Sequence, residues 1–219
     1  ADRELDATVP SRTHRLAPGP WAGTRPESRL ALDVAGAGGG DDDVLAIALA
    51  GEVALGGLGL GAHFVAQDVR LSEGDDGQSK VHDLSLVLRY GFGDEDARFT
   101  PYLRAALPVG PGHEDRVFGV EPGVAFRLSG EALFLEARAA LLALAHDVGT
   151  PLVGDALLAL GWKLGANMAL DLSAETLFGD DAHGGWRHIV GLGTTLGIGD
   201  VHLGATLGVG LGERDATLG

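Results

Sequence analysis

The sequence predicts an all-β fold, an up-and-down antiparallel transmembrane β-barrel, and two observations lead to this prediction. The first is a two-residue period, seen in VHLGATLGVGLG (residues 201–212), where every odd position is apolar and every even position is glycine, threonine or histidine. This alternation is typical of a strand whose two faces meet different surroundings. The second is a regular alternation of short turns and long polar loops from residue 28 onward. A meander with all its short turns at one end, as in membrane barrels, produces this order.

Composition limits the possible functions. The 219 residues include 36 glycines, which suit turns and close-packed strands better than helices. The net charge of −15 argues against a basic surface for nucleic acid, so we expect no nucleic-acid partner. The absence of cysteine excludes disulfides and thiolate metal sites. No apolar run reaches the length of a membrane-spanning helix without charged interruptions.

Eleven segments carry the strand pattern, and each is about long enough to cross a bilayer when tilted. The expected strands are residues 29–37, 44–55, 58–70, 81–92, 98–109, 116–128, 133–145, 152–164, 167–178, 188–198 and 201–212. Residues 1–27 contain four prolines, mixed charge and no periodicity. We interpret them as an irregular tail or plug, and residues 28–219 as the barrel domain.

The two faces of these strands differ in charge. One face collects large apolar side chains, and the other alternates charged and polar residues with Ala and Gly. An apolar interior is hard to fill, because eleven or twelve strands enclose a bore wider than ordinary side chains occupy, and no segment has the period of a central helix. We therefore expect the apolar face outside. The expected lumen-lining residues are Arg29, Asp33, Glu52, His63, Asp83, Arg89, Tyr102, Arg104, Glu121, Arg127, Glu136, Arg138, Asp155, Lys163, Asp171 and Glu175.

Aromatic residues support this assignment of faces. Five of them share the apolar register and lie within a few residues of a short turn: Tyr90, Phe92, Phe99, Phe126 and Trp162. Amphipathic aromatic rings prefer the interface between membrane and water. We expect these five side chains to form one ring at the membrane interface near the short turns.

Dyad repeats such as LALDVAG, LSLVLRYGFG, MALDLSAETLF and VHLGATLGVGLG, joined by alternating turn lengths, extend over about residues 28–212. This region resembles bacterial outer-membrane β-barrel proteins of the porin-like class. The resemblance implies a location in the bacterial outer membrane and contact with outer-membrane lipid. Single-chain barrels of this class have an even number of strands, so eleven visible strands imply a twelfth, from a longer chain, another segment or another chain. Pro101, Pro108 and Pro122 within the expected strands each require a bulge or a strand end.

Two functions are compatible with the predicted lumen. Six basic and eight acidic residues nearly balance, which favours cross-strand ion pairs and an interior filled with water or with salt bridges. The first function is a passive channel for small hydrophilic solutes or ions. The second is a closed structural barrel that anchors, or belongs to, a larger envelope complex, with a partner protein or further copies of the chain.

Catalysis and metal binding have weaker support. Acidic loops such as residues 41–43, 73–76 and 180–181 could hold calcium, but Asp and Gly are ordinary turn residues. His82 and Ser85 lie close in sequence but have opposite parity, which would separate a base from its nucleophile. We expect no enzyme, metal or cofactor. Purification as a compact monomer without detergent would instead indicate a soluble barrel and reverse the assignment of faces.

Overall fold

A computed structural model describes residues 25–38, 44–70, 84–107, 118–145, 152–165, 167–178, 186–198 and 201–211. Strands account for nearly all of these residues, as the two-residue period predicts. Their bounds are β1 Arg29–Gly38, β2 Val44–Leu55, β3 Leu58–Arg70, β4 Leu84–Tyr90, β5 Phe92–Gly93, β6 Ala97–Leu107, β7 Phe118–Ser129, β8 Leu133–Ala145, β9 Leu152–Lys163, β10 Met168–Phe178, β11 Trp186–Ile198 and β12 Val201–Leu211. Among the described residues, no helix is long and apolar enough to cross a membrane.

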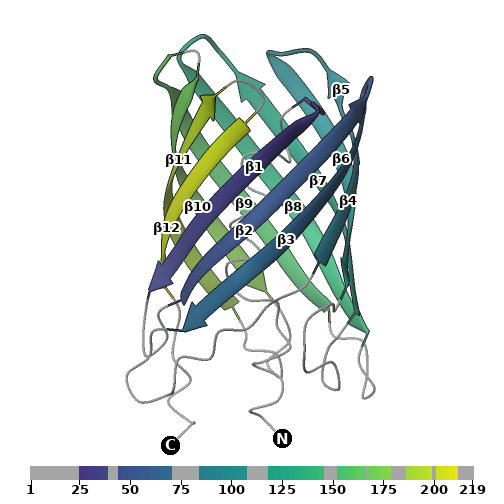
Figure 1. Cartoon of the computed structure of the whole chain (residues 1–219), viewed down its shortest axis with the longest axis vertical. Coiled ribbons are helices and arrows are strands. Elements are labelled where there is room, and N and C mark those ends of the chain that lie inside the picture. Colours follow the sequence, from purple (N-terminus) through teal and green to yellow (C-terminus); the bar gives the residue numbers. More distant parts are fainter. Residues whose placement is uncertain are drawn as a thin grey trace, which may run out of the picture.

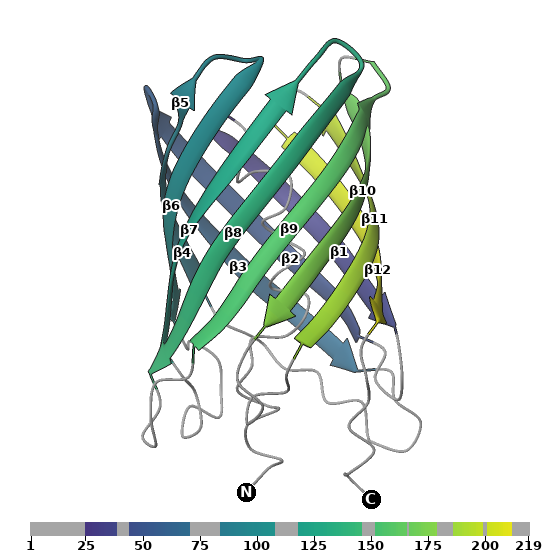
Figure 2. The ribbon, with the colours of Figure 1, turned by 180° about the vertical axis from the view of Figure 1, so that it is seen from behind.

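The strands form one closed barrel. The long strands pair in sequence order, with β4 paired to β6 beside the short β5, and β1 pairs with β12 to complete the circle. Figures 1 and 2 show the tilted strands from opposite sides, with the short turns at the upper rim. The barrel therefore has eleven long strands, and the two-residue β5 extends the line of β4 at the rim. The all-β barrel and the eleven strand positions predicted from the sequence are confirmed.

The barrel closes without the expected twelfth strand. In a meander with an odd number of strands, the first and last strands run in the same direction. The pair that closes it, β1 with β12, is accordingly parallel, from Leu30 opposite Val201 to Gly38 opposite Val209. All other pairs are antiparallel. The even strand number implied by the resemblance is corrected, because a parallel pair supplies the missing backbone partners.

Two of the three strand prolines lie where the hydrogen-bonded ladder is interrupted. Pro101 is paired with β7 but lies just beyond the last pair between β4 and β6, Arg89 with Tyr102. Pro122 is paired with Leu103 on β6, whereas the ladder between β7 and β8 skips it. These breaks accommodate residues that have no N–H to donate. Pro108 lies outside the described residues.

The exposed and buried sides of the strands match the predicted faces. Large apolar residues are exposed around the whole barrel, for example Leu88, Leu103, Leu158 and Leu192. Among the side chains that are described, the outward strand positions carry no Asp, Glu, Lys or Arg. The alternate positions, which point into the barrel, carry the charged and polar residues. The polar interior is therefore enclosed by an apolar outer surface.

Candidate functional site

The lumen is the candidate site, because polar side chains from nearly all parts of the wall meet there. Among the described residues, twelve polar or charged residues are buried: Glu52, Ser85, Arg89, Arg98, Thr100, Arg104, Glu121, Glu136, Arg138, Asp155, Ser173 and Glu175. The alternation of each strand points these side chains inward. Apart from Arg98, the charged members are held by ion pairs between strands, in three clusters.

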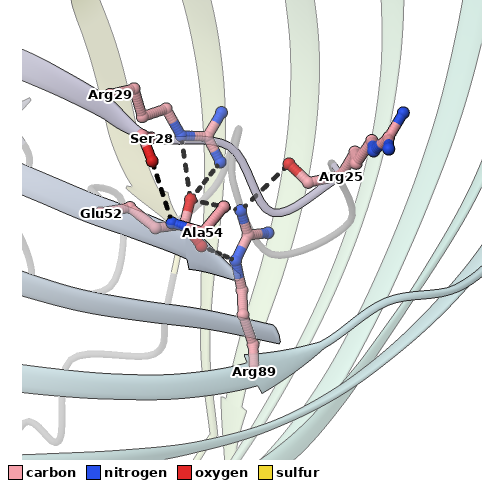
Figure 3. A network of polar contacts seen from close by, with 6 residues as sticks. All are labelled: Arg25, Ser28, Arg29, Glu52, Ala54 and Arg89. Atoms are coloured by element: carbon pink, nitrogen blue, oxygen red, sulfur yellow. Dashed lines mark hydrogen bonds and ion pairs between the residues drawn. The ribbon is translucent and has the colours of Figure 1, made fainter. Parts of the chain in front are cut away.

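The first cluster lies at the short-turn end and is centred on Glu52 of β2. Its carboxylate accepts hydrogen bonds from Arg29 of β1, at 3.1 Å from Nε and 3.0 Å from Nη2. Arg89 of β4 donates to the same carboxylate, with both distances at 2.6 Å. Figure 3 shows the two guanidinium groups on either side of Glu52. One carboxylate thus joins β1, β2 and β4 across the glycine-rich wall of β3.

The chain leading into β1 also lies against the inner wall. Arg89 donates to the backbone carbonyl of Arg25 at 3.4 Å, and the hydroxyl of Ser28 accepts from the backbone N–H of Ala54 at 3.1 Å (Figure 3). Pro26 is buried. A Cβ atom added at Gly59 would lie 3.1 Å from Cβ of Pro26, so the absence of a side chain there leaves room for it. Residues 25–28 are therefore fixed inside the barrel mouth by backbone and side-chain contacts.

The second cluster joins β6 and β7. Arg104 forms a buried ion pair with Glu121, its direct partner in the ladder. The hydroxyl of Tyr102 donates to the same carboxylate at 3.4 Å. Gly123 lies opposite Tyr102, and a Cβ atom there would lie 2.3 Å from Cζ of the ring. The glycine lets the tyrosine ring lie flat over the wall and fill part of the bore.

The third cluster spans β7 to β10. Arg138 of β8 donates to Asp155 of β9 at 3.0 Å and to Glu175 of β10 at 2.8 Å. Nearby, Arg127 forms an ion pair with Glu136 at 3.1 Å. The guanidinium carbon of Arg127 also lies 3.9 Å from the centroid of the inward-pointing Phe134 ring, within the range of a cation–π contact.

These contacts place the predicted lumen residues as follows. Besides Arg127, nine charged ones are members of the three clusters: Arg29, Glu52, Arg89, Arg104, Glu121, Glu136, Arg138, Asp155 and Glu175. Arg127 and Tyr102 belong to the same clusters, and His63 and Asp171 occupy inward positions with partial exposure. Lys163 is corrected from the lumen to the rim, where it is exposed and donates to the carbonyl of Gly130 at 2.8 Å. Asp83 and the side chain of Asp33 lie outside the described residues.

Among the described residues, sequence reasoning missed Arg98, Phe134 and three buried aliphatic residues at inward positions, Leu142, Leu157 and Ile189. Arg98 has the same parity as Tyr102 and Arg104 and is only 7% exposed. Phe134 has the same parity as Glu136 and is 8% exposed. The signal for both was present in the strand period. Phe134 is accommodated because Gly161 lies directly opposite, where a Cβ atom would come within 1.9 Å of the ring.

The five predicted aromatic residues all lie on the outer surface near the short turns. Their exposed fractions run from 37% for Trp162 to 53% for Phe92. Phe92 links two neighbours, with ring centroids 4.6 Å from Tyr90 and 6.5 Å from Phe99, and Phe99 is paired with Phe126. Four of them form a row across β4 to β7 and Trp162 lies on β9, and their place at a membrane interface stays a prediction.

Other kinds of site receive no support from the described residues. They contain no cluster of three or more His, Cys, Asp or Glu side chains suited to a metal ion. The acidic loops and His82, considered for calcium and catalysis, lie outside the described ranges. A scan of protein-family models and a search of curated proteins found no match to this chain. The arguments for function therefore rest on the barrel and its lumen.

Proposed function

We propose that this chain is a bacterial outer-membrane β-barrel whose lumen is closed by its own side chains, so that it acts as a structural barrel of the envelope. The observation that carries the proposal is the burial of the lumen charges. Glu52, Arg89, Arg104, Glu121, Glu136, Arg138, Asp155 and Glu175 are each at most 6% exposed. Charges along an open aqueous channel would remain in contact with water. Here they contact one another, and such burial is tolerated only with paired, hydrogen-bonded partners.

The outer surface supports the membrane part of the proposal. Soluble monomers rarely expose contiguous apolar patches above a few hundred Å². Each long strand of this barrel exposes large apolar side chains on its outer face. The wall is also closed, so every strand has hydrogen-bonding partners on both sides, as a structure in lipid requires. Outer-membrane barrels keep short turns on the periplasmic side. The rim with the aromatic ring would then face the periplasm, and a partner protein or further copies would bind at the exposed ends.

A passive channel for small hydrophilic solutes is the second candidate, and one part of the wall favours it. The inward positions of β11 from residue 191 onward are Gly191, Gly193, Thr195 and Gly197. Their neighbours on β12 include Gly204 and Thr206. Apart from His202, which is paired with Gly197, the paired positions of this sector are glycine or threonine. A path for small solutes along it would need no rearrangement of the three ion-pair clusters.

Single-channel recording of the detergent-purified full chain in a planar bilayer separates the two functions. We expect the wild-type protein to insert, as shown by flotation with vesicles, without producing steady openings. Arg138→Ala removes the side chain that joins β8, β9 and β10 and is expected to produce measurable conductance. Lys163→Ala, at the exposed rim, serves as the matched control and should stay silent. Steady wild-type openings with ion selectivity under a salt gradient would overturn the closed barrel in favour of the channel.

A further inference from the structure

The short-turn mouth of the barrel contains more buried positive charge than buried negative charge. Arg89 and Arg98 are 4% and 7% exposed, and the Arg29 side chain is 6% exposed. Among the described side chains of β1 to β6, Glu52 is the buried carboxylate of this group. The neighbouring acidic residues Glu27, Asp94 and Glu95 are exposed to solvent, which screens their charges. An anion entering the mouth would therefore meet a positive local field.

Among these cations, Arg98 donates to a backbone carbonyl rather than to a carboxylate. Both Nε and Nη2 donate to one backbone carbonyl, that of Asp94, at 3.1 and 2.6 Å. A guanidinium fork of this kind matches the two oxygens of a carboxylate or phosphate. Here the fork contacts a neutral acceptor, and the carboxylates of Asp94 and Glu95 that act on this cation are exposed to solvent.

Arg25 brings a second such group to the same place. A Cβ atom at Gly91 would lie 3.1 Å from Cδ of Pro26 and 3.4 Å from Cδ of Arg98, so the Arg98 stem passes beside the residue that follows Arg25. The charges of Arg25 and Arg89 act on Arg98, as do the opposite charges of Glu95 and Glu27. In Figure 3 the Arg25 side chain extends away from the Glu52 cluster, while its carbonyl accepts from Arg89. The contact between Arg89 and the Arg25 carbonyl fixes the backbone that carries this cation.

We propose that the barrel mouth binds a small oxyanion, a phosphate or carboxylate group, between Arg98 and Arg25. Glu52 shows that a carboxylate fits this environment, because it already lies between two arginine forks a short distance along the wall. The ligand adds the negative charge that this end of the lumen lacks among its buried groups. The site lies at the mouth and needs no open lumen, so it does not depend on the result of the conductance experiment.

Thermal unfolding of the full chain in detergent micelles tests the site, with inorganic phosphate as the probe and sodium chloride holding the ionic strength constant. We expect a saturable rise in Tm of about 3–6 °C when phosphate exceeds its Kd by about tenfold. Sodium acetate in a parallel titration identifies the ligand class. A saturable rise with both anions indicates any oxyanion, and a rise with phosphate alone indicates a phosphate group. The absence of a saturable rise with either anion overturns the proposal.

Three variants localise the effect. Arg98→Gln and Arg25→Gln each remove one cation, and we expect each to weaken phosphate binding by about tenfold or more. Arg25 is exposed, so Arg25→Gln should retain the wild-type Tm without phosphate even if Arg98→Gln perturbs the turn at Asp94. Lys163→Gln removes a cation from the same rim at an exposed position and should bind as the wild type does. Equal phosphate responses in all three variants would show non-specific binding and contradict the site.

Discussion

At the scale of single residues, the lumen is organised by arginine side chains that join neighbouring strands. Arg89 of β4 reaches the carboxylate of Glu52 on β2, and Arg138 of β8 reaches that of Glu175 on β10, in each case two strands away. Buried charges are costly to desolvate, so each depends on its partner. The pairs therefore fix the positions of strands relative to one another, and single charge-removing substitutions should have large effects.

Glu52→Gln tests this dependence. It removes the counter-charge shared by Arg29 and Arg89 while both side chains stay buried. We expect the free energy of unfolding to fall by about 3–5 kcal/mol, the usual cost of breaking a buried ion pair. Urea unfolding in micelles, followed by circular dichroism, measures the change. Glu131→Gln, in the exposed turn before β8, is the control and should alter stability by no more than about 0.5 kcal/mol. Similar losses for both variants would contradict the structural role of the cluster.

At the scale of elements, short turns set the register of adjacent strands. The turn between β5 and β6 begins at Gly93, whose φ of 99° is suited to glycine. Asp94 follows, and its carboxylate accepts the backbone N–H groups of Ala97 at 2.9 Å and Asp96 at 3.0 Å. Those two bonds, first that of Ala97, hold the pKa of Asp94 below its ordinary value of 3.8. The ionised carboxylate therefore stabilises this turn.

The stability contribution of Asp94 should depend on pH. A depressed carboxyl pKa stabilises the fold at pH values above the unfolded pKa, and the stabilisation is lost as the pH falls through the folded pKa. We expect wild-type Tm to exceed that of Asp94→Asn near neutral pH, with the difference vanishing at pH values well below 3.8. Asp96 lies in the same turn, but its carboxylate accepts neither of these bonds. Asp96→Asn should therefore show no such pH-dependent change. A pH-independent difference would contradict the charge-dependent role.

The parallel seam between β1 and β12 makes a second prediction at this scale. Leu32 lies opposite Leu203, and both side chains are exposed on the outer face. Because the chain has no cysteine, the double variant Leu32→Cys/Leu203→Cys should form one intramolecular disulfide on oxidation. The pair Leu32→Cys/Leu207→Cys would be adjacent only if the seam were antiparallel about the same centre, and should stay reduced. Cross-linking read by gel mobility distinguishes the two directions, and the opposite result would disprove the parallel closure.

At the scale of the whole molecule, the barrel reverses the usual arrangement of a folded protein. Its charged residues are inside and its large apolar residues are outside. Water around this surface would make the arrangement unfavourable, because exposing apolar side chains to water costs free energy. Lipid makes it favourable, because apolar side chains are at no disadvantage in hydrocarbon and the charges are kept out of it. For the proposed membrane barrel, the depth of an outward residue in the bilayer should therefore decide its tolerance to charge.

Leu158 and Leu164 provide a matched pair for this prediction. Both are exposed on the same side of one chain segment, Leu158 midway along β9 and Leu164 just beyond its end. For a barrel in lipid, we expect Leu158→Arg to cost about 2–4 kcal/mol and Leu164→Arg about 0–1 kcal/mol. Unfolding in phospholipid vesicles measures both values. Equal, small effects would indicate that the surface faces water.

The sequence by itself determined the strand positions and the two faces. The outward Leu register and the inward positions of Arg104, Glu121 and Arg138 follow from a period of two residues, which each strand displays without reference to the others. The same rule could have found Arg98 and Phe134. Turn residues such as those at 56–57 predicted where neighbouring strands join, because turn chemistry is also local.

Only the tertiary structure decided how the barrel closes and which charges meet. The parallel contact between β1 and β12 joins the two ends of the barrel segment, and no local pattern encodes it. Likewise, Arg89 meets Glu52 two strands away, and Arg138 meets Glu175 two strands away, because strand stagger and curvature bring them together. Parity places a side chain inside the barrel, but its partner depends on the closed geometry of the whole sheet.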